Sequence, residues 1–181
     1  VDGGATDPGI VSITTDATTT DADIVLGTVV ESGAASALSL TSGAGDITTT
    51  GPIGTDLTPI GAFSAIGSTI TFDADIDAVG ISATGSTLIS VDPDPSGAVV
   101  IDGRGSDIDF AGEDIAIRTT ATAAVLQSTG ARLILRGNDA GDRICIVDGA
   151  TAAQVDLSEA ELQTAASGRT EIVMGADATQ C

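Results

Sequence analysis

A strand-like pattern that returns every 23 residues is the feature that most constrains how this chain can fold. The pattern reads DIVLGTV around Ile24, DITTTGPI around Ile47 and TITFDADI around Ile70. A second row of similar segments interleaves with it at intervals of 25, 25 and 18 residues and contains Ile13, Leu38, Phe63 and Ile81. Each segment is short, alternates apolar with polar residues and is closed by Gly, Asp or Pro. This is typical of a strand with one buried face.

Short strands at a fixed period predict an all-β fold of the right-handed parallel β-helix (β-solenoid) type, because like residues of successive coils can then stack. We expect Ile24, Ile47 and Ile70 to form one internal ladder. Three Phe with no Trp or Tyr suit a narrow core of small and β-branched side chains. An antiparallel sandwich is the alternative, but it does not need the same pattern to return at a fixed period.

We predict a single solenoid domain over residues 1–181, with regular coils at about 10–90 and less regular coils at about 91–156. The end segment, 157–181, breaks the strand pattern. In LSEAELQTAASG, Ser158 and Glu161 have the spacing of a capping box, and Gly168 stands where a helix would end. A short helix followed by a strand is therefore expected near the C-terminus, where the helix could cover one end of the stack.

The charge of the chain limits its partners. Its net charge is −20, from 26 acidic residues against six basic ones, and all six are Arg at or after Arg104. Nucleic-acid binding needs cations that neutralise phosphates, so it is excluded as a function class. Binding to anionic membrane surfaces is disfavoured for the same reason. No window of the sequence is apolar and long enough to span a bilayer, so membrane insertion is not expected.

Several of these segments together resemble a known family. SITTDATTTDADIVLGTVV, GDITTTGPIG and TITFDADIDAVG resemble the repeats of large bacterial surface β-helix proteins of the filamentous-haemagglutinin-like adhesin type, and VDLSEAELQTAASGRTEIVMG is similar to a segment that recurs in them. The resemblance implies a secreted, extracellular or cell-surface β-helix used in fibres, adhesion or a cell-envelope matrix. Such proteins are usually far longer than 181 residues. The chain is therefore expected to be a piece of one, or a small relative that gains length by assembly.

The residue types argue against an enzyme. Histidine is absent, which removes the Ser-His-Asp and Cys-His nucleophile systems and the usual zinc ligand sets. Paired carboxylates could still serve a carbohydrate-active β-helix enzyme. Such an enzyme usually needs basic or aromatic groups along its groove, and residues 1–103 carry 14 carboxylates and no cation. We therefore expect no enzymatic activity and no cofactor, with the carbohydrate-active enzyme as the third alternative.

The segment FDADID holds the candidate metal ligands. Asp73, Asp75 and Asp77 alternate, so on one strand they would project from the same side. Three close carboxylates repel one another unless a cation or water screens them, and calcium is the cation that prefers oxygen ligands. The other interpretation, which we favour, is a solvated outer face without a metal.

Threonine tracts raise a different ligand. A flat Thr-x-Thr array on a solenoid can order water, so an adhesin module that binds ice or a glycan is the second functional hypothesis. The TTT at 48–50 and the pair Thr69 and Thr71 fit such an array, whereas Val25 and Gly27 do not. Thr is also simply a favourable strand residue.

Charge asymmetry and open strand edges favour self-association. Arg132, Arg136 and Arg143 could pair with nearby Asp139, Asp142 and Asp148, or could offer a positive patch to the acidic N-terminal part of another copy. A head-to-tail contact would satisfy both edges of the stack and would build a filament. Cys145 and Cys181 are expected to form an intrachain disulfide, with an interchain bond through Cys181 as the alternative. Sequence therefore predicts a structural, self-assembling extracellular β-solenoid subunit.

Overall fold

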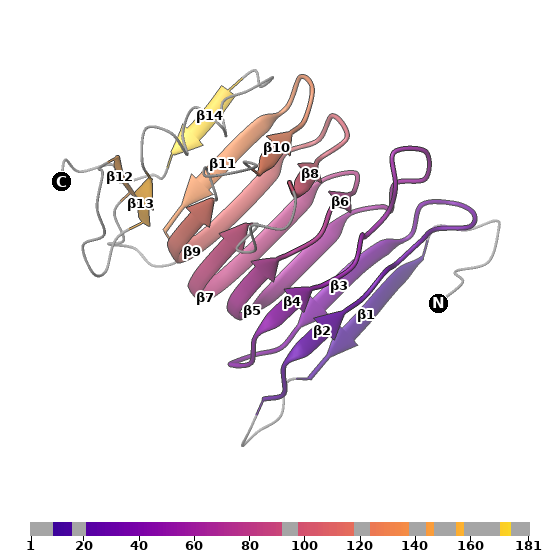
Figure 1. Cartoon of the computed structure of the whole chain (residues 1–181), viewed down its shortest axis with the longest axis horizontal. Helices are drawn as coiled ribbons and strands as arrows, with labels where there is room; N and C mark the ends of the chain where they lie inside the picture. The colour runs from indigo at the N-terminus through magenta and orange to yellow at the C-terminus, as the bar shows by residue number, and fades with distance from the viewer. Residues whose placement is uncertain are drawn as a thin grey trace.

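The computed structural model confirms an all-β solenoid of stacked parallel strands (Figure 1). It describes residues 9–15, 21–91, 98–117, 124–137, 144–146, 155–157 and 171–174. The strands are β1 (Ile10–Thr14), β2 (Ile24–Leu26), β3 (Ala37–Thr41), β4 (Ile47–Thr49), β5 (Phe63–Phe72), β6 (Ile76–Asp77), β7 (Ile81–Val91), β8 (Val100–Asp102), β9 (Ile108–Ile117), β10 (Val125–Gln127), β11 (Arg132–Arg136), β12 (Ile144–Ile146), β13 (Val155–Leu157) and β14 (Glu171–Met174).

The largest sheet runs along the whole stack. Its strands follow the order β1-β3-β5-β7-β9-β11-β14, and every neighbouring pair is parallel. β2 and β4 extend this sheet beside β5. A second sheet has the order β10-β8-β6, and β12 pairs with β13. Strands that follow one another in a sheet therefore belong to successive coils.

The ladder predicted from the 23-residue period is confirmed. Ile24 is in register with Ile47, and Ile47 with Ile70. The same ladder continues to Ile89 and Ile115. All five side chains are buried, so each coil adds one isoleucine to a continuous apolar column.

The second predicted row is confirmed for Leu38, Phe63 and Ile81, which lie in register, but the prediction was wrong for Ile13. Ile13 pairs with Leu40, and Val11 is the residue in register with Leu38. A shift of two residues keeps the same side chains facing the core. Alternation alone therefore cannot choose between these registers.

Three strands are longer than predicted because they continue through a corner of the coil. In β5, β7 and β9 the register shifts after aligned glycines, which are Gly67, Gly85 and Gly112. A Cβ atom on Gly67 would lie 2.5 Å from Oγ of Ser42 and 3.0 Å from the carbonyl oxygen of Gly45. A side chain at this position would push the corner away from the neighbouring coil, so glycine is required there.

The core is a narrow column inside the coils. All three phenylalanines are buried in it, and their rings contact one another. The centroids of Phe63 and Phe72 are 6.0 Å apart in an edge arrangement, and those of Phe72 and Phe110 are 5.7 Å apart and stacked. The few aromatic residues therefore fill the widest part of the column together.

Aspartate side chains bond successive coils to each other. In each case the carboxylate accepts the backbone N–H of a residue one coil further along the chain. Four of these bonds, at 2.8–2.9 Å, join Asp23 to Asp46, Asp46 to Thr69, Asp75 to Val100 and Asp107 to Arg132, which are 23 or 25 positions apart. Part of the acidic composition is thus structural, since it supplies acceptors for N–H groups at coil corners.

The predicted C-terminal helix lies outside the described residues, except that Leu157 is the last residue of β13. In the less regular region, about 91–156, the structure contains strands β8 to β12, and the strand expected in the end segment is confirmed as β14.

The isoleucine ladder can be tested with Ile47→Asp. An unpaired carboxylate at this fully buried position should lower the free energy of unfolding by about 4 kcal/mol. The matched control is Thr48→Asp, on the outer face of the same strand, which should cost about 0.5 kcal/mol or less. Urea unfolding measures both. Equal stability of the two variants would contradict the internal ladder.

Candidate functional site

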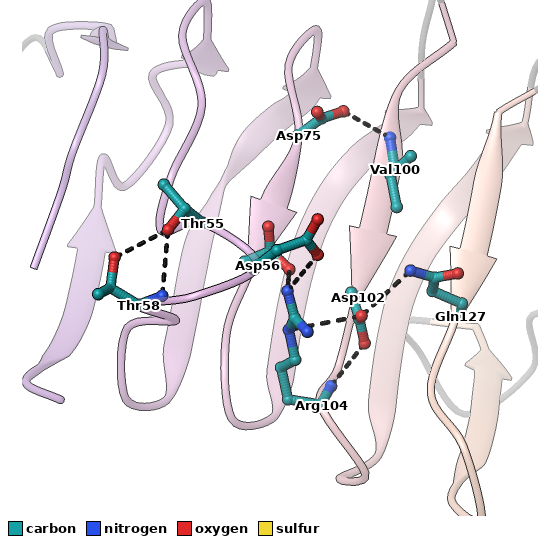
Figure 2. Close-up of polar contacts among 9 residues, drawn as sticks. Thr55, Asp56, Thr58, Asp75, Val100, Asp102, Arg104 and Gln127 are labelled. Carbon is teal, nitrogen blue, oxygen red and sulfur yellow. Dashed lines mark hydrogen bonds and ion pairs between the residues drawn. The ribbon is translucent and has the colours of Figure 1, made fainter.

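A group of polar side chains lies on the outer face of the three-stranded sheet (Figure 2). Asp77, Asp102 and Gln127 end β6, β8 and β10, and they are aligned in register. The residue before each of them points into the core, so strand alternation places these three side chains outside. Nε2 of Gln127 donates to Oδ2 of Asp102 at 3.1 Å.

Arg104 is the cation of this group and lies in the turn after β8. Its φ angle of 49° is in the left-handed region, which non-glycine residues rarely adopt. Its backbone N–H donates to Oδ1 of Asp102 at 2.8 Å. The side chain crosses the sheet, where Nη2 lies 2.6 Å from Oδ1 of Asp56 and also contacts Asp77, while Nε lies 3.4 Å from Oδ2 of Asp102. One guanidinium thus connects three successive coils.

Asp56 reaches Arg104 from a projecting loop at 54–59. The N–H of Thr55 donates to the carbonyl of Thr58 and the reverse bond also forms, both at 3.1 Å. The two hydroxyls lie 2.8 Å apart, which closes the loop further (Figure 2). Leu57 at its tip is 93% exposed. The loop therefore has its own internal bonds and is anchored to the solenoid by the Asp56–Arg104 ion pair.

Burial and the attraction between opposite charges shift the pKa values of Asp77 and Arg104 in opposite directions. Desolvation raises the pKa of Asp77, the hydrogen bond and charge of Arg104 oppose this, and the charges of Asp56 and Asp102 add to it. Desolvation alone would lower the pKa of Arg104, but its hydrogen bonds to Asp56 and Asp77 and the nearby carboxylates raise it. The outcome is a raised pKa for Asp77, because burial outweighs the attraction of Arg104, and a raised pKa for Arg104.

Oxygen atoms of Asp56, Asp77 and Asp102 lie within 4.8 Å of one another, a spacing that a metal ion could bridge. The guanidinium of Arg104 already contacts all three carboxylates. We therefore describe Asp56, Asp77, Asp102 and Arg104 as an ion-pair cluster, in which Arg104 is the cation. Its chemical effect is to fix the 54–59 loop and the ends of β6 and β8.

The structure separates the three predicted calcium ligands. β5 ends at Phe72, the chain bends, and β6 begins at Ile76, so FDADID is not one continuous strand. Asp75 accepts the N–H of Val100, and only Asp77 of the three belongs to the carboxylate group within metal-bridging distance among the described residues. Neither calcium binding by Asp73, Asp75 and Asp77 nor the solvated face without a metal, which we favour, is tested by this arrangement. Sequence reasoning missed Asp56 and Arg104, because 21 and 27 residues separate them from Asp77.

Two of the late arginines pair with aspartates of the preceding coil. Arg132 Nη2 lies 2.5 Å from Asp107, and Arg136 Nε lies 2.9 Å from Asp109. The hydrogen bond from the Arg132 side chain is the main cause that lowers the pKa of Asp107. These two arginines therefore neutralise acidic residues of their own chain. Arg143 and the partners considered from sequence, Asp139, Asp142 and Asp148, lie outside the described residues.

A second surface of interest is a row of hydroxyl side chains on the outer face of the largest sheet. Ser12, Ser39, Ser64 and Ser82 lie in register on β1, β3, β5 and β7. Two residues further along these strands the outer ladder contains Thr14, Thr41, Ile66 and Thr84. We call these eight residues the hydroxyl face. It carries no charged residue, and the first charge in the serine ladder is Asp109 of the next coil.

The array predicted from the threonine tracts lies elsewhere and is less regular. Thr48 is in register with Val25 and Thr71, and the ladder continues to Ser90. Thr69 belongs to a different ladder, in which it is in register with Leu88, and its N–H bonds the Asp46 carboxylate. The serine row was missed in the sequence because its first coil is longer by two residues than the spacing we expected.

A third feature is an open apolar cavity at the N-terminal end of the stack. Its volume is about 190 Å³, and it is lined mainly by apolar residues of the first two coils, including Val11, Ile13, Leu26, Val29 and Leu38. Val11, Ile13, Leu26 and Val29 are only partly buried, whereas their counterparts in the interior coils are fully buried. The core therefore ends here without a covering layer in the described part of the chain.

Comparisons of the chain with protein-family models, curated proteins and solved structures found no match. Within the described residues, no helix is long and apolar enough to cross a membrane. Cys145 lies in β12, while Cys181 lies outside the described residues, so the expected disulfide stays a prediction.

The role of the ion-pair cluster can be tested with Arg104→Met, which keeps the backbone strain of a non-glycine residue at this position. The loss of the cation should lower the free energy of unfolding by about 2 kcal/mol at pH 7, because Asp77 and Asp102 are left partly buried without their partner. The matched control is Arg136→Met, whose half-exposed ion pair should contribute less than about 1 kcal/mol.

Acid should reduce the effect of Arg104→Met. A raised folded-state pKa means that the contribution of Asp77 to stability is fully present below its unfolded pKa and is lost as pH rises through its folded pKa. Without Arg104 that pKa rises further. The difference from the unmodified protein should therefore shrink towards about pH 3.5. An identical difference at both pH values would mean that Arg104 acts by packing alone.

Proposed function

We propose that this chain is a non-enzymatic structural element of an extracellular fibre or surface matrix, and that it assembles by head-to-tail stacking of solenoids. The observation that carries the proposal is the N-terminal end of the stack. There, an edge strand with no further partner among the described residues occurs together with an apolar cavity, whereas the described interior coils cover both features with the next coil.

The edge of β1 has backbone groups available for pairing. Ala37 N–H bonds Gly9 C=O and Thr15 N–H bonds Thr41 C=O, both at 2.9 Å. The backbone N–H and C=O groups of the odd-numbered residues of β1 therefore point towards β3. The N–H and C=O groups of Ile10, Ser12 and Thr14 therefore point away from β3. Among the described residues no strand lies beyond them. Such an edge is a template for another parallel strand.

Charge does not drive this contact, because Arg132 and Arg136 already pair within the chain. What supports it is local neutrality, since residues 9–15 carry no charge in a chain of net charge −20. Two copies with this net charge repel at low ionic strength. Their least repulsive contact is one that involves this neutral end, and salt should strengthen it by screening.

The resemblance of the repeats to filamentous-haemagglutinin-like surface proteins supports the extracellular part of the proposal. The coil is taken to be right-handed, as connections between parallel strands of one sheet almost always are. In this proposal the chain works by its length and surface, with no cofactor, no nucleic acid and no membrane insertion.

Assembly can be tested with Ser12→Pro. Proline removes the N–H that points away from β3 and leaves the β1–β3 bonds in place, so it should block strand addition without unfolding the chain. Light scattering and electron microscopy should show elongated oligomers of the unmodified protein that grow with protein and salt concentration, and mainly monomers of the variant. Ser12→Ala, which keeps the N–H, is the control. A strictly monomeric unmodified protein at high concentration and physiological salt would refute the proposal.

The hydroxyl face favours a second candidate function, adhesion to a neutral ordered surface such as a glycan or ice. Neighbouring rows on this face are spaced by about 4.8 Å across strands and about 7 Å along them. Hydroxyl groups on such a rigid lattice can bond a repeating array of oxygen atoms. The absence of charge on these eight residues makes the ligand a neutral one.

This candidate can be tested with Ser64→Asp, which places a charge in the middle of the hydroxyl face. Retention on immobilised neutral polysaccharide, or incorporation into growing ice, should fall severalfold. The control is Thr71→Asp, on the same strand and the same side of the sheet but beyond the corner. Equal binding by both variants would rule out the hydroxyl face as the adhesive surface.

A further inference from the structure

We infer that β14 of one copy pairs with β1 of the next in one defined register, with Ile172 beside Val11 and Met174 beside Ile13. This inference rests on the proposed head-to-tail assembly and specifies its interface. The partner is a second copy of this chain, and the contact is a parallel strand addition that continues the largest sheet.

The side chains at the two ends carry the inference. Two inward ladders run through the largest sheet. One contains Val11, Leu38, Phe63, Ile81, Ile108, Leu133 and Ile172, and the other contains Ile13, Leu40, Ala65, Ala83, Phe110, Leu135 and Met174. Their interior members are at most 4% exposed. Their end members, Val11 and Ile13 at one end and Ile172 and Met174 at the other, are only partly buried. Within the described part of the chain, each ladder therefore ends in an incompletely covered apolar residue at both ends.

Stacking one copy on the next would place like ladder positions in contact. Ile172 would cover Val11, and Met174 would cover Ile13 at the mouth of the apolar cavity. A shift of one residue would turn these side chains out to solvent and bring Val173 and Glu171 inward. Only registers that differ by two residues keep the apolar columns continuous. Of these registers, the one that places Ile172 beside Val11 and Met174 beside Ile13 covers the end residues of both columns.

The backbone supports the same alignment. Hydrogen bonds along the sheet alternate regularly: Leu38 N–H bonds Ala62 C=O, Phe63 N–H bonds Gly80 C=O, and Ile81 N–H bonds Asp107 C=O. Carried through the register of β9, β11 and β14, this alternation directs the N–H and C=O groups of Ile172 and Met174 away from β11. These are the groups that face the outward N–H and C=O of β1 when Ile172 lies beside Val11.

Four interchain bonds follow from this geometry. Ile172 N–H donates to Ile10 C=O, and Ser12 N–H donates to Ile172 C=O. Met174 N–H donates to Ser12 C=O, and Thr14 N–H donates to Met174 C=O. The pattern is the same as between β1 and β3. There, each bonded residue of one strand forms its bonds with the two residues that flank its register partner on the other strand.

Cysteine cross-linking between two differently marked copies tests the register. In a background with Cys145→Ser and Cys181→Ser, one copy carries Ser12→Cys and the other carries Val173→Cys. In the inferred register these positions are neighbours in the outward serine ladder. Adjacent strands place their Cα atoms about 4.8 Å apart, which permits a disulfide. After oxidation, the mixture should give a covalent dimer on non-reducing electrophoresis.

Matched pairs distinguish this register from its alternatives. Val173→Cys mixed with Ile10→Cys or with Thr14→Cys reports the registers shifted by two residues, and each should give about tenfold less dimer. Ser12→Cys alone should give none, because a like-end contact is not inferred. A dominant dimer from a shifted pair, or from Ser12→Cys alone, would overturn the inference.

Scattering on the same samples separates failure of the register from failure of assembly. Oligomers without any of these cross-links would overturn the β14–β1 contact and leave head-to-tail assembly standing. Absence of oligomers from the uncross-linked samples would overturn both.

Discussion

The backbone ladder between one coil and the next is the interaction on which the rest of this structure depends. A single coil encloses a column of core only one or two side chains wide, and it cannot bury that column without neighbours above and below it. The ladder places residue on residue, so that Ile24, Ile47 and Ile70 form one column although 23 positions separate them in sequence. Burial and the alignment of the corner glycines both follow from this superposition.

Corners are the places where the ladder alone is insufficient, and there the acidic residues complete it. Side-chain acceptors such as Asp46 and Asp107 take the N–H groups that no strand oxygen reaches. Where two carboxylates of successive coils come close, as Asp77 and Asp102 do, Arg104 neutralises them and secures the 54–59 loop as well. Much of the acidic character is thus part of the fold, and it leaves the outer face of the first four coils of the largest sheet neutral.

The period of the sequence was sufficient to predict the solenoid and the first isoleucine ladder, because a repeat of 23 leaves one register possible. It was insufficient where the coil length changes. The first coil is longer, so Val11 rather than Ile13 aligns with Leu38, and alternation is unaffected by such a two-residue shift. The Arg104 cluster was beyond sequence reasoning for a related reason. Its members come from three coils. They meet only because Arg104 adopts a positive φ angle in its turn, which no sequence pattern predicts.

The ends of the described stack differ from its interior, and the proposed head-to-tail association rests on that difference. In the described interior of the largest sheet, the apolar columns and strand edges are covered by the next coil, and the sides outside the hydroxyl face carry carboxylates. At the ends the columns stop in partly buried residues and the first strand bears no charge. Outside the hydroxyl face, contacts between sides would bring like charges together, whereas the proposed contacts between ends would bury apolar area and pair backbone groups. In the proposed assembly, whole copies add along the same axis for the same physical reason that the fold stacks its own coils.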